Sequence, residues 1–340
     1  MQIRAEAGQA PRRTRLRRAS IDDLTIRRVR VGRHFGYRDA QGGKVADKET
    51  LARIRSLAIP PAYDDVRIAA DPRAHLQAVG RDEAGRIQHR YHPDWERVRE
   101  RRKLKRLSSL IGVLPRLRQR IEHDLKDRTL SRNKALAAAA AVIDRCHIRV
   151  GNEVYARTHG SYGASTLLKR HVAVSGSRVA LSFRGKAGKD IACECEDARL
   201  ARAIARLATL PGRRLFQYRE DDGSVAIVSA SEINAYLREA AGMPVSSKDL
   251  RMLAANAAAA ELLLASDIAA SERGRRRQLA DIMRAIAERL VNTPAVVRKS
   301  YVHAIVVDSY ASGRLQSAYR KARGRGGCSR IERALGVLAG

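Results

Sequence analysis

The apolar pattern of this chain changes near Pro93, and this change constrains the fold more than any other feature of the sequence. Before Pro93, short runs with strand character dominate, and a turn composition, Gln41-Gly42-Gly43, follows the first of them. One stretch, residues 47–57, has the acidic start and the length of a helix. A small β-rich domain is therefore predicted, with strands at 24–31, 66–69, 75–79 and 86–92.

Helical patterns take over after Pro93. The strongest is the alanine-rich run over residues 133–148, because alanine has the highest helix propensity. Ser246-Ser247-Lys248-Asp249 is a capping-box pattern that predicts a helix start, and Pro294 suits the first turn of a later helix. A period of two over residues 172–195 predicts a β-hairpin with Lys186 at its glycine-flanked tip. Further helices are expected at 95–108, at 114–125, from about 197 onwards around a β-like interruption at 216–228, and at 272–291.

These patterns predict an α+β protein with two domains. The β-rich domain covers residues 21–94, and a larger, mainly helical domain with a β-hairpin covers residues 95–315. The flanking residues 1–20 and 316–340 are rich in arginine and have little regular apolar pattern. We predict a flexible basic arm and a basic tail in these two places.

The charge of the chain indicates a polyanionic partner. The 340 residues include 67 Lys and Arg against 36 Asp and Glu, which gives a formal net charge of +31. Arginines recur from Arg4 to Arg333, so the charge is not confined to a tail. Aromatic residues make up only 4% of the chain, which is poor in platforms for stacking bases. Duplex DNA held through its phosphates is favoured, with ribosome or RNA binding as the plain alternatives.

Cysteines and known motifs give no sign of a cofactor. The four cysteines form no CxxC pair, and we expect reduced thiols in a cytoplasmic protein; Cys193 and Cys195 fit small hydrophobic positions in a strand. The sequence has no G-x-x-x-x-G-K-[ST] loop for ATP and no carboxylate cluster for a pair of metal ions. It also has no apolar run that would suit a signal peptide or a membrane span.

Tyr301 follows Asn292 by nine residues and stands just after two cations. Alone it would be assigned to the core, because Val297, Tyr301 and Ile305 share one helical face. Three cations further upstream change this interpretation, since the five polar residues together look like one active site. The upstream cations are Arg149 in Ile148-Arg149-Val150-Gly151-Asn152, Lys186 in Phe183-Arg184-Gly185-Lys186 and Arg251 in Lys248-Asp249-Leu250-Arg251.

In this order and with these contexts, the five residues resemble the catalytic set of poxvirus-like type IB DNA topoisomerases, in their bacterial branch. The likeness covers most of the chain, because the N-terminal half carries similar segments. These are Gly36-Tyr37-Arg38-Asp39, Leu57-Ala58-Ile59-Pro60-Pro61-Ala62-Tyr63, His75-Leu76-Gln77-Ala78, Gly80-Arg81-Asp82 and Arg90-Tyr91-His92. The resemblance implies a monomeric, nucleoid-associated enzyme whose two domains form a C-shaped clamp around duplex DNA and relax supercoils without ATP or metal.

The resemblance also implies a role for each residue. Tyr301 would attack the phosphodiester to give a 3′-phosphotyrosyl link, while Arg149 and Arg251 stabilise charge on the non-bridging oxygens. Asn292 would donate a hydrogen bond to the same oxygens. Lys186 would protonate the leaving 5′-oxygen, with Lys189 as the competing assignment. Tyr155 and Lys248 are candidate DNA contacts.

Two alternative functions are compatible with parts of the sequence. A tyrosine recombinase shares the Arg, Lys, Arg, Tyr chemistry but normally has His-x-x-Arg at the second arginine, where this chain has Lys248 in the histidine place. A nucleoid or RNA-binding protein without enzymatic activity would explain the charge alone.

Overall fold

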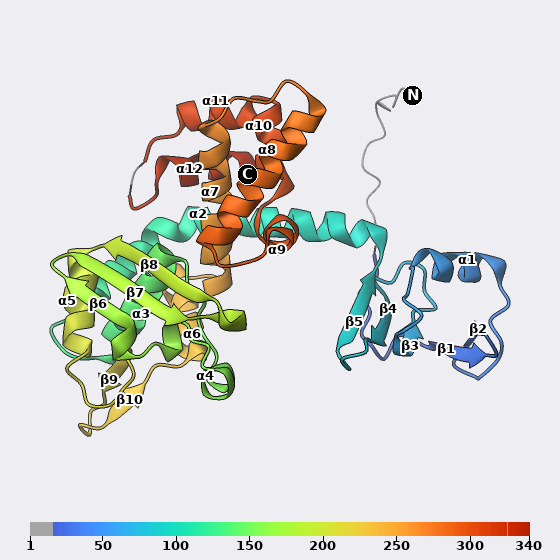
Figure 1. Cartoon of the computed structure of the whole chain (residues 1–340), viewed down its shortest axis with the longest axis horizontal. Coiled ribbons are helices and arrows are strands. Elements are labelled where there is room, and N and C mark those ends of the chain that lie inside the picture. The colour runs from blue at the N-terminus through green and yellow to red at the C-terminus, as the bar shows by residue number, and fades with distance from the viewer. Residues whose placement is uncertain (1–15, 325) are drawn as a thin grey trace. The chain divides into compact units, whose positions relative to one another are not determined.

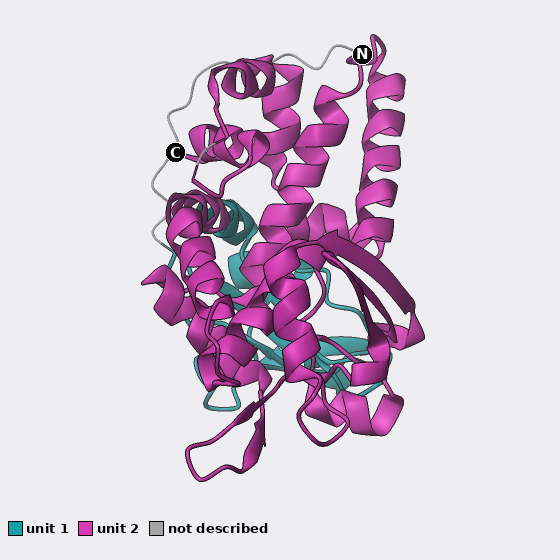
Figure 2. Ribbon diagram, turned by 90° about the vertical axis from the view of Figure 1, so that its left-hand side faces the viewer, with its two compact units in different colours: residues 1–102 teal, residues 103–340 magenta. Residues whose placement is uncertain are grey.

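The structure is a computed structural model that describes residues 16–324 and 326–340. It divides into two compact units, residues 1–102 and 103–340, which are described separately here (Figure 2). Within the described ranges, no helix is both long enough and apolar enough to cross a membrane. All the site residues predicted from the sequence belong to the second unit.

The first unit is built on a five-stranded antiparallel sheet in the order β2-β1-β3-β4-β5 (Figure 1). Helix α1 (Lys48–Ser56) begins after Asp47, whose carboxylate accepts a hydrogen bond from Thr50 N at 2.7 Å. Ile54 of this helix packs on buried residues of the sheet such as Ile68. The predicted β-rich domain is confirmed, and its strands are β1 Ile26–Val31, β2 His34–Arg38, β3 Asp64–Ile68, β4 Leu76–Arg81 and β5 Ile87–Tyr91.

Two features of this unit differ from the sequence-based expectation. Strand β2 was not predicted, because Gly36 lies in its middle and none of its residues is fully buried. The predicted flexible arm lies mostly outside the described residues, but its last part is bound to the unit. Arg17 N donates to Arg73 O at 2.9 Å, and His75 N donates to Arg17 O at 2.8 Å.

Helix α2 (Pro93–Leu125) joins the two helical stretches expected at 95–108 and 114–125 into one helix that contains Pro115. The division between the units falls inside this helix, after residue 102, rather than at the predicted residue 94. The physical reason is Trp95, whose ring centroid lies 4.5 Å from that of His75 and 6.2 Å from that of Tyr91. These ring contacts attach the first turns of α2 to the sheet unit.

The second unit is built around the alanine-rich helix α3 (Arg132–Cys146), which is buried almost along its whole length. Alanine leaves room for close neighbours, and α5, α6 and α7 all pack against it (Figure 1). This arrangement bears out the mainly helical assignment. The other helices are α4 Glu153–His159, α5 Ala198–Leu207, α6 Ala230–Ala241, α7 Ser247–Leu264, α8 Glu272–Arg289, α9 Pro294–Val296, α10 Ala304–Ala311, α11 Arg314–Lys321 and α12 Arg330–Ala339.

Two small antiparallel sheets complete this unit. The larger has the order β6-β7-β8, and the turn between β7 and β8 is the predicted hairpin tip that carries Lys186. The smaller accounts for the β-like interruption near 216–228. Its strands are β9 Gln217–Arg219 and β10 Val225–Ile227, and those of the larger sheet are β6 Val172–Ser175, β7 Arg178–Arg184 and β8 Asp190–Glu196.

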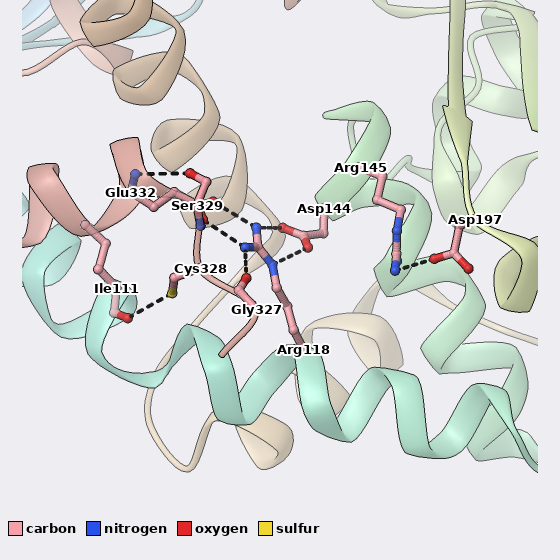
Figure 3. Close-up of polar contacts among 9 residues, drawn as sticks. All are labelled: Ile111, Arg118, Asp144, Arg145, Asp197, Gly327, Cys328, Ser329 and Glu332. Carbon is pink, nitrogen blue, oxygen red and sulfur yellow. Dashed lines mark hydrogen bonds and ion pairs between the residues drawn. The ribbon is translucent and has the colours of Figure 1, made fainter. Parts of the chain in front are cut away.

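The predicted basic tail at 316–340 is wrong, because these residues form much of α11 and all of α12. Ile331, Leu335 and Leu338 of α12 are buried in the main core. Arg118 of α2 fixes this helix in place: its guanidinium bonds Asp144 of α3 at 2.8 and 3.0 Å and Glu332 at 2.9 Å (Figure 3). The apolar spacing of three and four residues in α12 was present in the sequence, but the surrounding arginines concealed it.

Candidate active site

A hollow of about 910 Å³ in the second unit gathers most of the predicted site residues. Four of the five predicted catalytic residues line it, namely Arg149, Lys186, Arg251 and Tyr301. The two predicted DNA contacts, Tyr155 and Lys248, line it as well. Asn292 does not, but its Oδ1 accepts a hydrogen bond of 2.5 Å from Arg149 Nη2. Residues more than 150 positions apart in the sequence therefore meet at one place.

Arg149 lies in a tightly folded turn after α3. The helix ends at Cys146 and is capped by His147, which has a left-handed conformation (φ 54°). The Arg149 carbonyl accepts from Ala164 N at 2.9 Å, and a Cβ added to Gly163 would lie only 2.6 Å from that carbonyl oxygen. Only glycine fits at residue 163, so the backbone of Arg149 is held by direct contact with a neighbouring loop.

Arg251 is buried, with only 4% of its surface exposed. Its Nη2 donates to Leu290 O at 3.0 Å, and its Nη1 donates to His147 O. Its Nε has no hydrogen-bond partner among the described residues. Burial lowers the pKa of Arg251, although the nearby Tyr301 opposes this effect. A guanidinium that lines the hollow is thus held by two backbone carbonyls, with its buried Nε left unpaired.

The start of α7, which carries Arg251, is fixed from two sides. Asp249 accepts from Ser246 N at 2.8 Å, as the capping-box pattern predicted. The same carboxylate is bound by Arg106 of α2, with Nε to Oδ1 and Nη2 to Oδ2 both at 2.6 Å. This bidentate ion pair holds the first turns of α7 against α2.

Asn292 follows a strained residue. Val291 has a φ of 50°, which is rare for a β-branched residue and costs about 1–3 kcal/mol. Asn292 N donates to Ala287 O at 2.8 Å, and its buried side-chain Nδ2 has no hydrogen-bond partner in the described part of the chain. Since Oδ1 accepts from Arg149, the orientation of the amide is fixed, with its buried Nδ2 left unpaired.

Tyr301 is the last residue of a π-helical turn, Val297–Tyr301, that continues α9. The chain becomes extended at Val302, so the expected helical face of Val297, Tyr301 and Ile305 does not exist, and Ile305 belongs to α10. π-helical turns are rare and occur mostly at functional sites. The ring of Tyr301 is 6% exposed, and its centroid lies 5.8 Å from the guanidinium carbon of Arg251.

The electrostatic surroundings favour ionisation of Tyr301. Burial alone raises the pKa of a phenol because it disfavours the charged form. Arg251 and Arg149, together with the Asn292 amide, outweigh burial and hold the pKa of Tyr301 below its ordinary value of about 10. A phenol with a lowered pKa beside two guanidinium groups and a free amide donor is suited to attack a phosphodiester.

Known protein families match most of this chain. Residues 92–323 match the family described as eukaryotic DNA topoisomerase I, catalytic core, and residues 34–82 match the bacterial DNA topoisomerase IB, N-terminal domain. The chain belongs to the type IB DNA topoisomerases. The DNA topoisomerase 1B of Acanthamoeba polyphaga mimivirus is 32% identical over 292 residues, which cover 84% of this chain and 87% of that protein. The resemblance noted in the sequence is confirmed in both halves of the chain.

The two candidate lysines of this type IB topoisomerase differ in position. Lys186 lies in the turn between β7 and β8, is exposed and lines the hollow. Lys189 does not line the hollow, and its Nζ donates to the backbone oxygen of Asn292 at 3.3 Å. Ala187 (φ 60°) and Gly188 (φ 72°) between them are both left-handed, which reverses the chain direction within one turn.

The two candidate DNA contacts lie at the rim. Tyr155 on α4 is 59% exposed, which is unusual for a large aromatic side chain. Lys248 is exposed in the first turn of α7. Both are available to a ligand that fills the hollow of the topoisomerase.

Sequence reasoning missed Asn256, which holds Tyr301 in place. Asn256 is fully buried on α7. Its Nδ2 donates to Tyr301 O at 2.9 Å, and its Oδ1 accepts from His303 N at 2.9 Å. Asn256 could have been noticed in the sequence, because it interrupts the alanine run Ala254-Ala255-Asn256-Ala257-Ala258. A polar residue on a buried helix needs a hydrogen-bond partner.

Asn256→Ala in this topoisomerase is expected to slow DNA cleavage by about 100-fold through a small displacement of Tyr301. Non-covalent DNA affinity should change little, because Asn256 is buried and does not line the hollow. Single-turnover cleavage and equilibrium binding, measured below the unfolding temperature of the variant, check this. Asn256→Asp keeps the acceptor for His303 N but sets a carboxylate oxygen against Met252 O and Tyr301 O, so it should not restore cleavage. Equal losses of binding and cleavage would show a general structural role instead.

Proposed function

We propose that this chain relaxes supercoiled duplex DNA by cutting and rejoining one strand through a 3′-phosphotyrosyl bond, without ATP or metal. The observation that carries the proposal is the convergence of Tyr301, Arg149, Lys186 and Arg251 in one hollow, with the pKa of Tyr301 lowered by the two arginines. A recombinase would share this chemistry, but the N-terminal domain match of residues 34–82 supports the topoisomerase.

In the proposed mechanism Tyr301 Oη attacks the phosphorus, and its proton leaves easily because of the nearby cations. Arg251 Nε and Asn292 Nδ2, which have no other partner among the described residues, donate to the non-bridging oxygens as negative charge builds up on them. Arg149 contributes charge and orients Asn292. Lys186 protonates the leaving 5′-oxygen, and the free 5′-hydroxyl later reverses the reaction. Tyr155 and Lys248 contact the DNA backbone.

A plasmid relaxation assay with a chelator and without ATP tests the proposal. Both positively and negatively supercoiled plasmid are expected to relax to the same final distribution, because a swivelling cut strand releases torsion of either sign. Loss of activity on adding the chelator would contradict the metal-free mechanism. DNA binding without relaxation would favour the non-enzymatic alternative, and recombined products would favour a recombinase.

We further propose that the chain acts as a monomer in the cytoplasm, at the nucleoid. The high positive charge over most of the sequence supports the nucleoid assignment. Closure of the two units around duplex DNA, which the resemblance implies, stays a prediction.

A further inference from the structure

Three of the four cysteines lie on two elements that pack together, α3 and β8, and the proposed mechanism uses none of them. Cys146 is the last residue of α3 and is buried, whereas Cys193 and Cys195 lie on β8 and are half-buried. Cys193 and Cys195 lie close enough to Cys146 to raise the pKa of its thiol. All three pack against the main core, so the sequence-based view of the strand pair as small hydrophobic residues describes their packing but not their grouping.

The geometry allows only bridges that include Cys146. Cys193 and Cys195 are two residues apart on one face of a strand, paired with Leu181 and Val179 of β7. Side chains at such positions stand about 6–7 Å apart, whereas a disulfide needs Cβ atoms about 3.5–4.5 Å apart. Cys146 is the last residue of α3, which packs against β8. No group of three or more His, Cys, Asp or Glu side chains in the described ranges is placed to hold a metal ion, so the chemistry of the cluster is that of thiols.

The three thiols are not equally reactive. The Cys146 S–H can donate to one strand sulfur at a time, which lowers the pKa of Cys193 and of Cys195, although burial opposes this. Arg145 lowers the pKa of Cys195 further. The same hydrogen bonds, together with burial, raise the pKa of Cys146. Cys193 also lines a surface hollow of about 410 Å³, so small molecules in solution can reach this region.

An accessible thiol with a lowered pKa next to a buried thiol with a raised pKa is the arrangement of an oxidant-sensing site. Oxidation attacks a thiolate that is accessible and has a low pKa, and a neighbouring thiol then resolves the product. We propose that these three cysteines form a peroxide-responsive site, in which Cys193 or Cys195 is oxidised and Cys146 then closes a disulfide between α3 and β8.

The strand thiolate attacks one oxygen of hydrogen peroxide, breaks the O–O bond and becomes a sulfenic acid, while the other oxygen leaves as water after taking up the thiol proton. The Cys146 sulfur then attacks the sulfenic sulfur, and the S–O bond breaks to release a second water. Two thiols are oxidised to one disulfide, and one peroxide is reduced to two waters.

The disulfide would join two elements whose ends lie close to site residues in the sequence. His147 and Arg149 follow directly after Cys146, and β8 begins directly after Lys189, which holds the backbone of Asn292. A new covalent link between α3 and β8 therefore restrains the hairpin that presents Lys186. This consequence rests on the proposed function, and we expect DNA cleavage to slow by about tenfold or more, since small displacements of catalytic groups are costly.

Disulfide mapping on the folded, full-length chain tests the site without any assay of activity. The reduced protein is treated with hydrogen peroxide, remaining thiols are blocked, and peptides are separated without reduction. We expect a mass loss of two hydrogen atoms and a link from Cys146 to Cys193 or Cys195. Cys146→Ala should form no internal disulfide, whereas Cys193→Ala and Cys195→Ala should each keep one. Cys328→Ala is the matched control, because the buried Cys328 thiol lies 3.9 Å from Ile111 O and should behave like the unaltered chain (Figure 3).

The activity arm uses the same samples. Peroxide should slow single-turnover cleavage, a thiol reductant should restore it, and Cys146→Ala should be insensitive to peroxide. Thiols that stay reduced, or a disulfide that involves Cys328, would overturn the site. A mapped disulfide with unchanged cleavage would overturn its effect on the reaction. If the untreated chain does not cleave DNA, the proposed function fails while the mapping still decides the thiol site.

Discussion

Replacing Tyr301 with phenylalanine is expected to abolish covalent capture of DNA while leaving DNA binding nearly intact. Only the attacking oxygen is lost, and the ring still fills its buried place beside Arg251. Removal of a nucleophile commonly lowers the rate by about four or more orders of magnitude. The measurement is the fraction of labelled DNA that stays attached to protein on a denaturing gel, with binding of the intact duplex measured in parallel.

Tyr310→Phe provides a matched control. Tyr310 lies on α10, is as buried as Tyr301, and donates its hydroxyl to Ser266 O outside the hollow. Its loss should cost about 1 kcal/mol of stability and leave covalent capture unchanged. If Tyr301→Phe still traps DNA on a denaturing gel, another tyrosine is the nucleophile and the assignment is wrong.

Lys186→Ala is expected to slow cleavage by about 10²–10⁴-fold, the usual contribution of a general acid. Lys186 lines the hollow, whereas Lys189 is engaged with the backbone of Asn292, so the two lysines should differ sharply. The decisive measurement uses DNA in which sulfur replaces the bridging 5′-oxygen. A thiolate leaves without a proton, so Lys186→Ala should recover nearly full cleavage on this substrate.

Variants of the other site residues show whether sulfur rescue is specific to loss of the general acid. Arg149→Ala and Arg251→Lys weaken stabilisation of the non-bridging oxygens and should be rescued much less by sulfur. Tyr301→Phe should not be rescued at all. Lys189→Ala should show a mild defect from looser placement of Asn292. A large defect with sulfur rescue in Lys189→Ala, and normal activity in Lys186→Ala, would transfer the general-acid role to Lys189.

The sequence was sufficient to predict the family and most of the residues that meet in the hollow. Arg149, Lys186, Arg251 and Tyr301 each stand in a short local context, and such contexts can be recognised without three-dimensional information. The division into a β-rich and a helical part was equally accessible, because hydrophobic periodicity is a local property.

Long-range contacts explain what the sequence did not predict. The π-helical turn at Tyr301 depends on Asn256, which binds Tyr301 O and His303 N from another helix. The strained φ of Val291 likewise depends on Arg251 Nη2, which holds the preceding carbonyl of Leu290. Propensity scales describe a residue and its neighbours in the chain, so they contain no information about either contact.

The ion pairs of Arg118 also bear on the order in which the chain can fold during synthesis. Arg118 and Asp144 leave the ribosome early, but Glu332 and the apolar face of α12 that covers Ile111 are made near the end. Until then, α2 and α3 expose apolar surface, and Arg118 lacks half of its carboxylate partners. Domains fold as units during translation, so we expect the second unit to become stable only after α12 has emerged. A chain truncated before α12 is therefore expected to be unstable and inactive in DNA cleavage.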